Sequence, residues 1–203
     1  HGATPVHIQL NLNDSMVCVV NQTTNEFGSI TAVISLYDLH GKLISEQKSP
    51  VNLKAQDVML LGMLKLQEDS NEVFFLKLQL VHNDKILDDN LYWLTNKSHS
   101  YEKLNELEKV TLKTILDNSV DGHAVITISN PENETAFFIR LKIMNARNEL
   151  RLPSFFSDNY FTLLPGDKKK IELDLAPDNN EVIQDNLKLM VEGWNILPEE
   201  IKF

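Results

Sequence analysis

The chain has 203 residues, of which 42% are hydrophobic and 24% charged, as in ordinary globular proteins of one large or two small domains. Its formal net charge is −10, which is unsuited to the phosphates of nucleic acids and to anionic membrane surfaces. No apolar run reaches the length of about 18 residues that a membrane-spanning helix needs. We therefore expect neither nucleic acid nor a membrane as a partner.

The chain opens with His1-Gly2-Ala3 rather than methionine, and no signal peptide is visible. We interpret it as a processed product or a cut-out fragment of a longer protein. The single cysteine, Cys18, excludes an internal disulfide. Its apolar neighbours predict a buried, unreactive thiol.

Alternating apolar and polar residues, together with continuous apolar runs at residues 16–20 and 58–66, predict β-strands through the first half of the chain. The expected strands cover residues 6–12, 16–20, 30–36, 43–47, 58–66, 73–82 and 90–94, with a break at Gly62. The segments Asp38-Leu39-His40-Gly41 and Asn83-Asp84 have the composition of hairpin turns. About seven strands at this spacing are typical of a β-sandwich.

The second half repeats this plan after a polar segment, residues 95–101, that shows no periodicity. A short helical turn is expected near Leu104 and Leu107, followed by strands at residues 110–115, 124–128, 137–144, 171–175 and 187–194. The segment Val17–Asn21 aligns with Val125–Ser129, or one residue further along, so that Asn21 meets Asn130. A repeat of about 105 residues indicates tandem domains. We therefore predict an all-β fold of two immunoglobulin-like β-sandwiches, residues 1–97 and 98–203.

Four aromatic residues lie close together after Leu150: Phe155, Phe156, Tyr160 and Phe161. Alternation predicts that Phe161 points inward and that Tyr160 lies on the opposite face. We expect most of the four to be buried in the second sandwich or in its seam with the rest of a longer chain, because burying one Phe contributes about 1.5–3 kcal/mol. Phe155, Phe156 and Tyr160 remain the candidates for contact with a sugar or a neighbouring domain.

Other chemistries have little support in the sequence. The six histidines form no His-x-His or His-x-x-x-His pair, so we interpret them as surface or turn residues rather than metal ligands. There is no Gly-x-Ser-x-Gly nucleophile motif and no glycine-rich phosphate loop. We interpret Asp88-Asp89 and Glu199-Glu200 as solvated, and residues 178–181 lack the ligand spacing of a calcium loop. We therefore expect no catalytic residue, metal or cofactor in this chain.

Two adjoining motifs carry a family resemblance. Ser157-Asp158-Asn159-Tyr160-Phe161, followed by Leu163-Leu164-Pro165-Gly166-Asp167, resembles the terminal immunoglobulin-like domain of family 2 glycoside hydrolases of the β-mannosidase and exo-β-glucosaminidase type. Residues 136–141, 90–94 and 5–10 resemble other parts of the same region. In that family the catalytic glutamate pair lies on a (β/α)₈ barrel upstream of these domains. This chain is too short for a barrel, so the resemblance places no catalytic residue here.

The resemblance implies a non-catalytic C-terminal accessory region of a glycosidase acting on β-linked sugars, with the β-mannosidase type preferred. Its partners would be the catalytic barrel and the N-terminal domains of the same parent chain. The parent would be a bacterial enzyme of carbohydrate metabolism, periplasmic or secreted.

Two alternatives remain. One is a carbohydrate-binding module whose aromatic loop captures a glycan. The other is an adhesin- or chaperone-like sandwich that binds partners along an exposed strand edge. The latter needs a long unprotected edge strand, whereas Lys168–Lys170 and the interrupting prolines are typical of edge protection.

Overall fold

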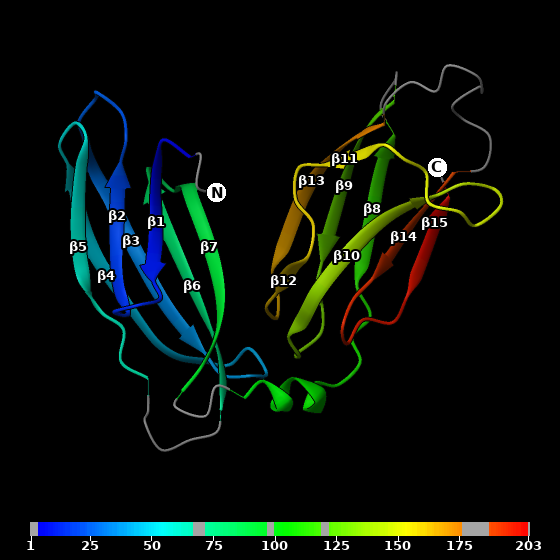
Figure 1. Ribbon diagram of the computed structural model, residues 1–203, viewed down its shortest axis with the longest axis horizontal. Coiled ribbons are helices and arrows are strands. Elements are labelled where there is room, and N and C mark those ends of the chain that lie inside the picture. The colour runs from blue at the N-terminus through cyan, green and yellow to red at the C-terminus, as the bar shows by residue number, and fades with distance from the viewer. Residues whose placement is uncertain (1–3, 67–71, 97–99, 119–121, 176–186, 203) are drawn as a thin grey trace. The chain divides into compact units, whose positions relative to one another are not determined.

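The regular secondary structure of the described residues is almost all β-strand, and the chain divides into two compact units, residues 1–106 and 107–203 (Figure 1). The computed structural model describes residues 4–66, 72–96, 100–118, 122–175 and 187–202. Each unit consists of two antiparallel sheets, so the predicted all-β fold of two tandem sandwiches is confirmed. The domain boundary predicted between residues 97 and 98 falls outside the described residues and stays a prediction. Within the described residues, no helix has the length and hydrophobicity that a membrane span requires.

The described part of the first unit contains a three-stranded and a four-stranded sheet, with orders β1-β2-β5 and β4-β3-β6-β7. Its strands are β1 (Val6–Asn11), β2 (Met16–Asn21), β3 (Phe27–Tyr37), β4 (Leu43–Leu53), β5 (Asp57–Met63), β6 (Val73–His82) and β7 (Lys85–Thr95). Each overlaps a predicted strand. Inward side chains such as Ile8, Val19 and Leu78 form one core. Cys18 is buried, as predicted.

Two of these strands are much longer than the alternation predicts. Strand β4 continues past residue 47 through Pro50 to Leu53. Proline is accommodated there because, among the described strands, β4 lies at the end of its sheet and has a pairing partner on one side only. Strand β7 begins directly after Asn83 and Asp84, whose φ angles of 49° and 60° form a two-residue hairpin turn.

Side chains of β7 close one side of the first sandwich by bonding to the backbone of β1. The amide of Ile8 donates to Oδ2 of Asp88 at 2.9 Å, and Nδ2 of Asn90 donates to the carbonyl of Ile8 at 2.7 Å. The amide of Leu10 donates to the hydroxyl of Tyr92 at 3.2 Å. The interpretation of Asp88 as solvated is therefore wrong, because its carboxylate satisfies an unpaired edge amide of β1.

Asp88 is expected to make stability depend on pH. Burial raises the pKa of its carboxyl above the usual 3.8, and the hydrogen bond from Ile8 opposes this shift. The folded protein then holds this proton to a higher pH than the unfolded chain does. Stability is therefore lost as pH rises from 3.8 through the folded-state pKa. Asp88→Asn keeps an acceptor for Ile8 without a charge, so urea unfolding between about pH 4 and 7 should show a flatter pH dependence.

Asp88→Ala should instead lower the free energy of unfolding by about 1–3 kcal/mol, because the buried amide of Ile8 loses its acceptor. The neighbouring Asp89 is exposed, and Asp89→Asn serves as the matched control. An unchanged pH slope in Asp88→Asn would contradict this account.

The second unit follows a short 3-10 helix, η1 (Glu102–Glu106), near the predicted helical turn. Its described strands form two four-stranded sheets, with orders β11-β13-β9-β8 and β12-β10-β14-β15. They are β8 (Lys113–Asn118), β9 (His123–Ser129), β10 (Ala136–Met144), β11 (Ser154–Phe156), β12 (Phe161–Leu163), β13 (Lys168–Leu175), β14 (Lys188–Glu192) and β15 (Glu199–Lys202). Side chains such as Ile126, Leu141 and Ile171 form the core between them.

Three predictions of the sequence have different outcomes in the structure. Glu199-Glu200 belongs to β15, which pairs with β14; Glu200 is exposed as expected, whereas Glu199 is half-buried. Lys168–Lys170 open β13, and because β11 pairs only with Leu173–Leu175, no described strand covers the lysine end of β13 on that side, which agrees with edge protection. His7 is buried in β1, where its Nδ1 lies 3.0 Å from the carbonyl oxygen of Thr4 and is thereby satisfied.

Corresponding asparagines show how the two units match. Nδ2 of Asn21 donates to the carbonyl four residues later and to that of Lys54, at 2.8 and 2.6 Å. Nδ2 of Asn130 likewise donates to the carbonyl four residues later and to that of Leu163, at 2.8 and 3.1 Å. In both cases Oδ1 accepts the amide two residues on. The alignment that places Asn21 on Asn130 is therefore the better of the two alternatives.

Candidate functional site

A groove opens along one side of the first sandwich, between the end strands of its two sheets. Its volume is about 390 Å³, within the usual range of about 300–1,000 Å³ for ligand pockets. The floor is aliphatic and consists of Val17, Ile34 and Leu36. One wall is formed by residues 45–47 of β4 and the other by residues 61–65, at the end of β5 and just after it.

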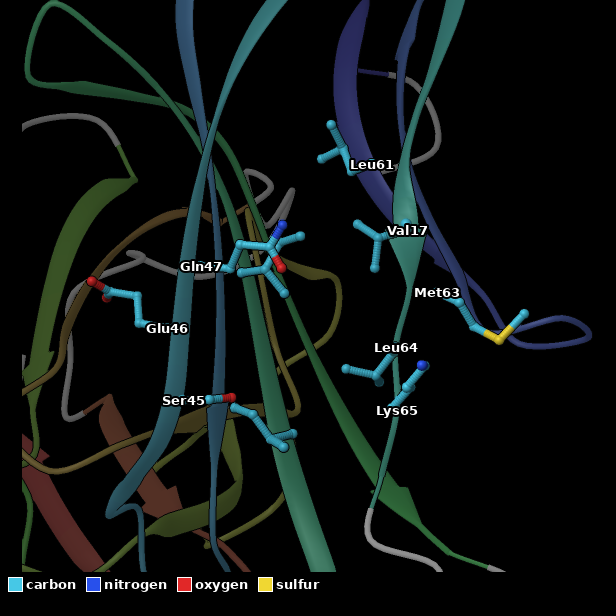
Figure 2. A pocket seen from close by; sticks show the side chains of 11 residues that line it. Val17, Ser45, Glu46, Gln47, Leu61, Met63, Leu64 and Lys65 are labelled. Carbon is cyan, nitrogen blue, oxygen red and sulfur yellow. The ribbon is translucent and has the colours of Figure 1, made fainter.

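The two walls differ in polarity. Figure 2 shows Ser45 and Gln47 directed from β4 into the groove, whereas Glu46 points away from it. Leu61 and Leu64 reach into the groove from the opposite wall. The groove thus combines an apolar floor, an apolar wall and a polar wall.

Local irregularities in β5 leave this space open. Val17 pairs with Gly62 and Cys18 pairs with Leu60, so Leu61 is an extra residue in a β-bulge. Gly62, at φ 137°, stands opposite the inward-facing Val17 and contributes no side chain. A Cβ built at Gly62 would have no neighbour within 4 Å.

Polar residues on β4 help to keep the groove open on its other side. Ile34 and Leu36 of β3 face the core side, and their partners on β4 are Gln47 and Ser45. Both of these side chains are exposed. Apolar residues at these positions would pack against β5, so the groove results from this pair of polar residues and from Gly62 together.

The groove suits binding better than acid–base catalysis. The hydrogen bond from Lys48 lowers the pKa of the Glu46 carboxyl, with burial opposing it, and Ser35 donates a further hydrogen bond at 3.3 Å. Glu46 also points away from the groove, and general acid–base catalysis is most effective when the pKa lies near the working pH, so Glu46 is a poor candidate for a general acid or base there. Across the described residues, no group of three or more His, Cys, Asp or Glu side chains is placed to hold a metal ion.

The four aromatic residues singled out in the sequence have different environments. Phe161 is 8% exposed and faces the core with Leu163, as predicted. Phe156 is half-buried against the same core. Tyr160 is 47% exposed, as expected for the outward exception, and Phe155 is 61% exposed. Phe155 lies outside the sandwich core, because neighbours on a strand face opposite sides and Phe156 takes the core side of β11. Its burial in a seam with the rest of a longer chain stays a prediction.

Tyr160 is part of a group that we call the aromatic face, which consists of the exposed residues Phe138, Tyr160 and Trp194 and the half-buried Arg140. The ring centroids of Phe138 and Tyr160 lie 5.3 Å apart, and the Arg140 guanidinium lies 5.7 Å from the Tyr160 centroid. The amide of Trp194 donates to the carbonyl of Phe137 at 3.1 Å, which places Trp194, 51% exposed, beside the Phe137–Phe138 segment. Sequence reasoning missed Phe138, whose only signal is an aromatic pair that breaks the alternation of β10.

The backbone of the aromatic face is strained. Phe138 and Tyr160 have φ angles of 56° and 60°. Phe138 lies where the pairing of β10 with β12 shifts between Ala136 and Ile139, a β-bulge that re-aims its side chain. Such conformations cost about 1–3 kcal/mol each and are concentrated at functional sites. The aromatic face is therefore the second candidate site.

Two protein-family models match the chain. Residues 90–196 match the exo-β-D-glucosaminidase Ig-fold domain. The chain belongs to this family. Residues 15–97 match the mannosidase Ig/CBM-like domain. The resemblance to the immunoglobulin-like domains of family 2 glycoside hydrolases is thus confirmed for both halves.

Curated relatives match nearly the whole chain. The exo-β-D-glucosaminidase of Arthroderma benhamiae is 25% identical over 96% of this chain and 24% of its own length. The enzyme of the same name from Hypocrea virens is 26% identical over 99% of this chain and 25% of its own length. The mannosylglycoprotein endo-β-mannosidase of Lilium longiflorum is 25% identical over 98% of this chain. The chain spans about a quarter of the length of the relatives it matches.

Solved structures share the fold. The exo-chitosanase of Amycolatopsis orientalis has a TM-score of 0.78 at 20% identity, covering 98% of this chain and 26% of that one. The β-D-mannosidase of Dictyoglomus thermophilum has a TM-score of 0.66 at 18% identity, covering 96% of this chain and 22% of that one. These similarities support the immunoglobulin-like fold of this family.

Proposed function

We propose that the chain is a non-catalytic accessory region of a family 2 glycoside hydrolase, with the catalytic domain elsewhere in the same parent chain. The observation that carries this proposal is that relatives named as glycosidases match nearly all of this chain but only about a quarter of their own length. A region of that size with a glycosidase family fold and a site suited to binding fits a supporting role.

The parent is proposed to release β-linked glucosamine residues. The family resemblance of the sequence favours the β-mannosidase type, and residues 15–97 match a mannosidase domain. Residues 90–196 match the exo-β-D-glucosaminidase Ig-fold domain, and the Arthroderma and Hypocrea relatives are named exo-β-D-glucosaminidases. These matches favour a glucosaminide over a mannoside as the substrate of the parent. A bacterial source and a periplasmic or secreted location stay predictions.

The aromatic face and Phe155 are proposed to contact the remainder of the parent chain. Tyr, Trp, Phe and Arg are enriched at the centres of protein interfaces, and Phe138, Arg140, Tyr160 and Trp194 have this composition. The preformed, strained backbone at Tyr160 and Phe138 supports the same role, because rigid contact residues lose little entropy on docking.

We expect the purified 203-residue chain to hydrolyse no aryl β-glucosaminide, β-mannoside or β-galactoside above the rate in buffer. The full-length parent should turn over at least one of them, with the glucosaminide fastest. Continuous release of the aryl group, measured side by side for the two proteins, provides the test. Turnover by the isolated chain would contradict the accessory role, and a parent inactive on all three substrates would contradict the glycosidase assignment.

A carbohydrate-binding module is the second candidate, favoured by the exposure of Phe155 and Tyr160. Exposed rings can stack on the apolar faces of sugars. Saturable binding of chitosan or mannan oligomers to the isolated chain, lost in Tyr160→Ala or Phe155→Ala, would decide for this candidate and against the scaffold role.

A further inference from the structure

The second unit shows how an extended segment closes the edge between the two sheets of one of these sandwiches. Strand β11 pairs with the end of β13, where Phe156 stands opposite Leu173. Phe156 packs against the core while its neighbour Phe155 remains outside. The side chain of Asn159 then bonds to both the amide and the carbonyl of Leu141, at 2.8 and 3.0 Å. One short segment therefore covers the edges of β13 and β10 and fills the space between them.

The first unit has a groove at the corresponding position. The amide of Leu64 donates to the carbonyl of Ser15 at 2.8 Å, and Leu173 pairs with Ala124. Ser15 precedes Asn21 by the same number of residues as Ala124 precedes Asn130. Leu64 is therefore the structural counterpart of Leu173, which pairs with Phe156 in the second unit. Leu64 instead lines the groove of Figure 2.

The end strand beside this groove has the features of a strand-pairing edge. In the described part of the chain, β5 ends the sheet β1-β2-β5. An end strand presents backbone N–H and C=O groups that an added strand can pair with. Its exposed side chains Val58, Leu60 and Met63 are uncharged, so they do not repel such a partner. In the described part of the chain no strand pairs with this edge, although the bulge at Leu61 interrupts its regular spacing.

We propose that the groove binds an extended peptide segment from outside the two units, which pairs with the end of β5 and places a large apolar side chain beside Leu61 and Leu64. The segment would complete the first unit as Ser154–Phe156 completes the second. Gln47 and Ser45 on the polar wall hydrogen-bond to its backbone. The inference goes beyond the proposed function and does not depend on the activity of the parent.

The lining favours a peptide over a sugar. The floor is formed by the branched aliphatic residues Val17, Ile34 and Leu36. None of the described residues that line the groove is aromatic, so no ring is available for a sugar to stack on. The edges of the end strands β4 and β5 instead offer backbone N–H and C=O groups at the spacing that an extended peptide backbone needs for hydrogen bonding.

The probe for this proposal is a synthetic peptide with the sequence of residues 151–157, labelled with a fluorophore and titrated into the intact chain. We expect saturable binding, together with slower amide hydrogen exchange in β5. The same peptide with Phe156→Asp should not bind, because it would place a charge in the apolar groove.

A matched pair of variants on β4 locates the binding site. Gln47→Trp fills the groove and should weaken peptide binding by about tenfold or more. Glu46→Trp places the same side chain on the opposite face and should leave the affinity within about twofold of wild type. If Gln47→Trp does not fold, the proposal is still tested by comparing the binding of the wild-type peptide and the Phe156→Asp peptide to the wild-type chain.

Several outcomes would overturn the proposal. They are an absence of binding, equal binding of the Phe156→Asp peptide, and equal loss in both β4 variants. Self-association that slows exchange in β5 without peptide would show that a second copy occupies this edge. Protection of β5 by chitosan or mannan oligomers would assign the groove to a sugar. None of these results bears on the assay of the full-length parent.

Discussion

Replacing Phe161 by alanine is expected to lower the free energy of unfolding of the second unit by about 3–5 kcal/mol. The ring is 8% exposed and belongs to the core between the two sheets. Phe161 of β12 pairs with Ile139 of β10, and the Lys169 ammonium lies 5.4 Å from the centroid of the Phe161 ring. Truncation removes the apolar contact area and leaves a cavity that the surrounding strands can fill only in part.

Urea unfolding followed by tryptophan fluorescence measures this effect. The chain has two tryptophans, of which Trp194 reports on the second unit, and a Trp93→Phe background silences the first. Phe155→Ala is the matched control, because its ring is 61% exposed and its loss should change stability by only about 0.5 kcal/mol. Equal destabilisation by the two substitutions would contradict the assignment of Phe161 to the core.

Replacing Asn130 by alanine is expected to lower the free energy of unfolding of the second unit by about 2–4 kcal/mol. Its side chain is 1% exposed and donates to the carbonyls of Glu134 and Leu163. Its Oδ1 accepts the amide of Glu132 at 3.2 Å. Removing this side chain leaves several backbone groups unpaired at a buried turn, and each unpaired group costs about 1–3 kcal/mol.

The exposed Asn133 lies in the same turn, and Asn133→Ala should leave the unfolding midpoint almost unchanged. Asn130→Asp provides a second comparison, since it keeps the acceptor but sets a carboxylate against two carbonyl oxygens. We expect it to be at least as destabilising as alanine in urea unfolding at neutral pH. A stable Asn130→Asp variant would show that the two donated hydrogen bonds contribute little.

The sequence by itself determined the class of fold and much of its outline. Alternation placed β1 almost to the residue, because a half-buried strand puts apolar side chains on one face only. A continuous apolar run placed β2 equally well, as is typical of a strand in a sandwich core. Asn83-Asp84 identified a hairpin, since these residues accept the positive φ that the turn requires. The motif from Ser157 to Asp167 indicated the family, which the comparison of residues 90–196 confirmed.

Only the tertiary structure decided which polar residues are buried and which apolar residues are exposed. Asp88 is buried because β1 happens to lie beside β7 and offers an unpaired amide. Phe138 is turned outward by a bulge whose position depends on the pairing of β10 with β12. The groove depends on β4 and β5 being end strands of facing sheets, a long-range property that local alternation does not encode.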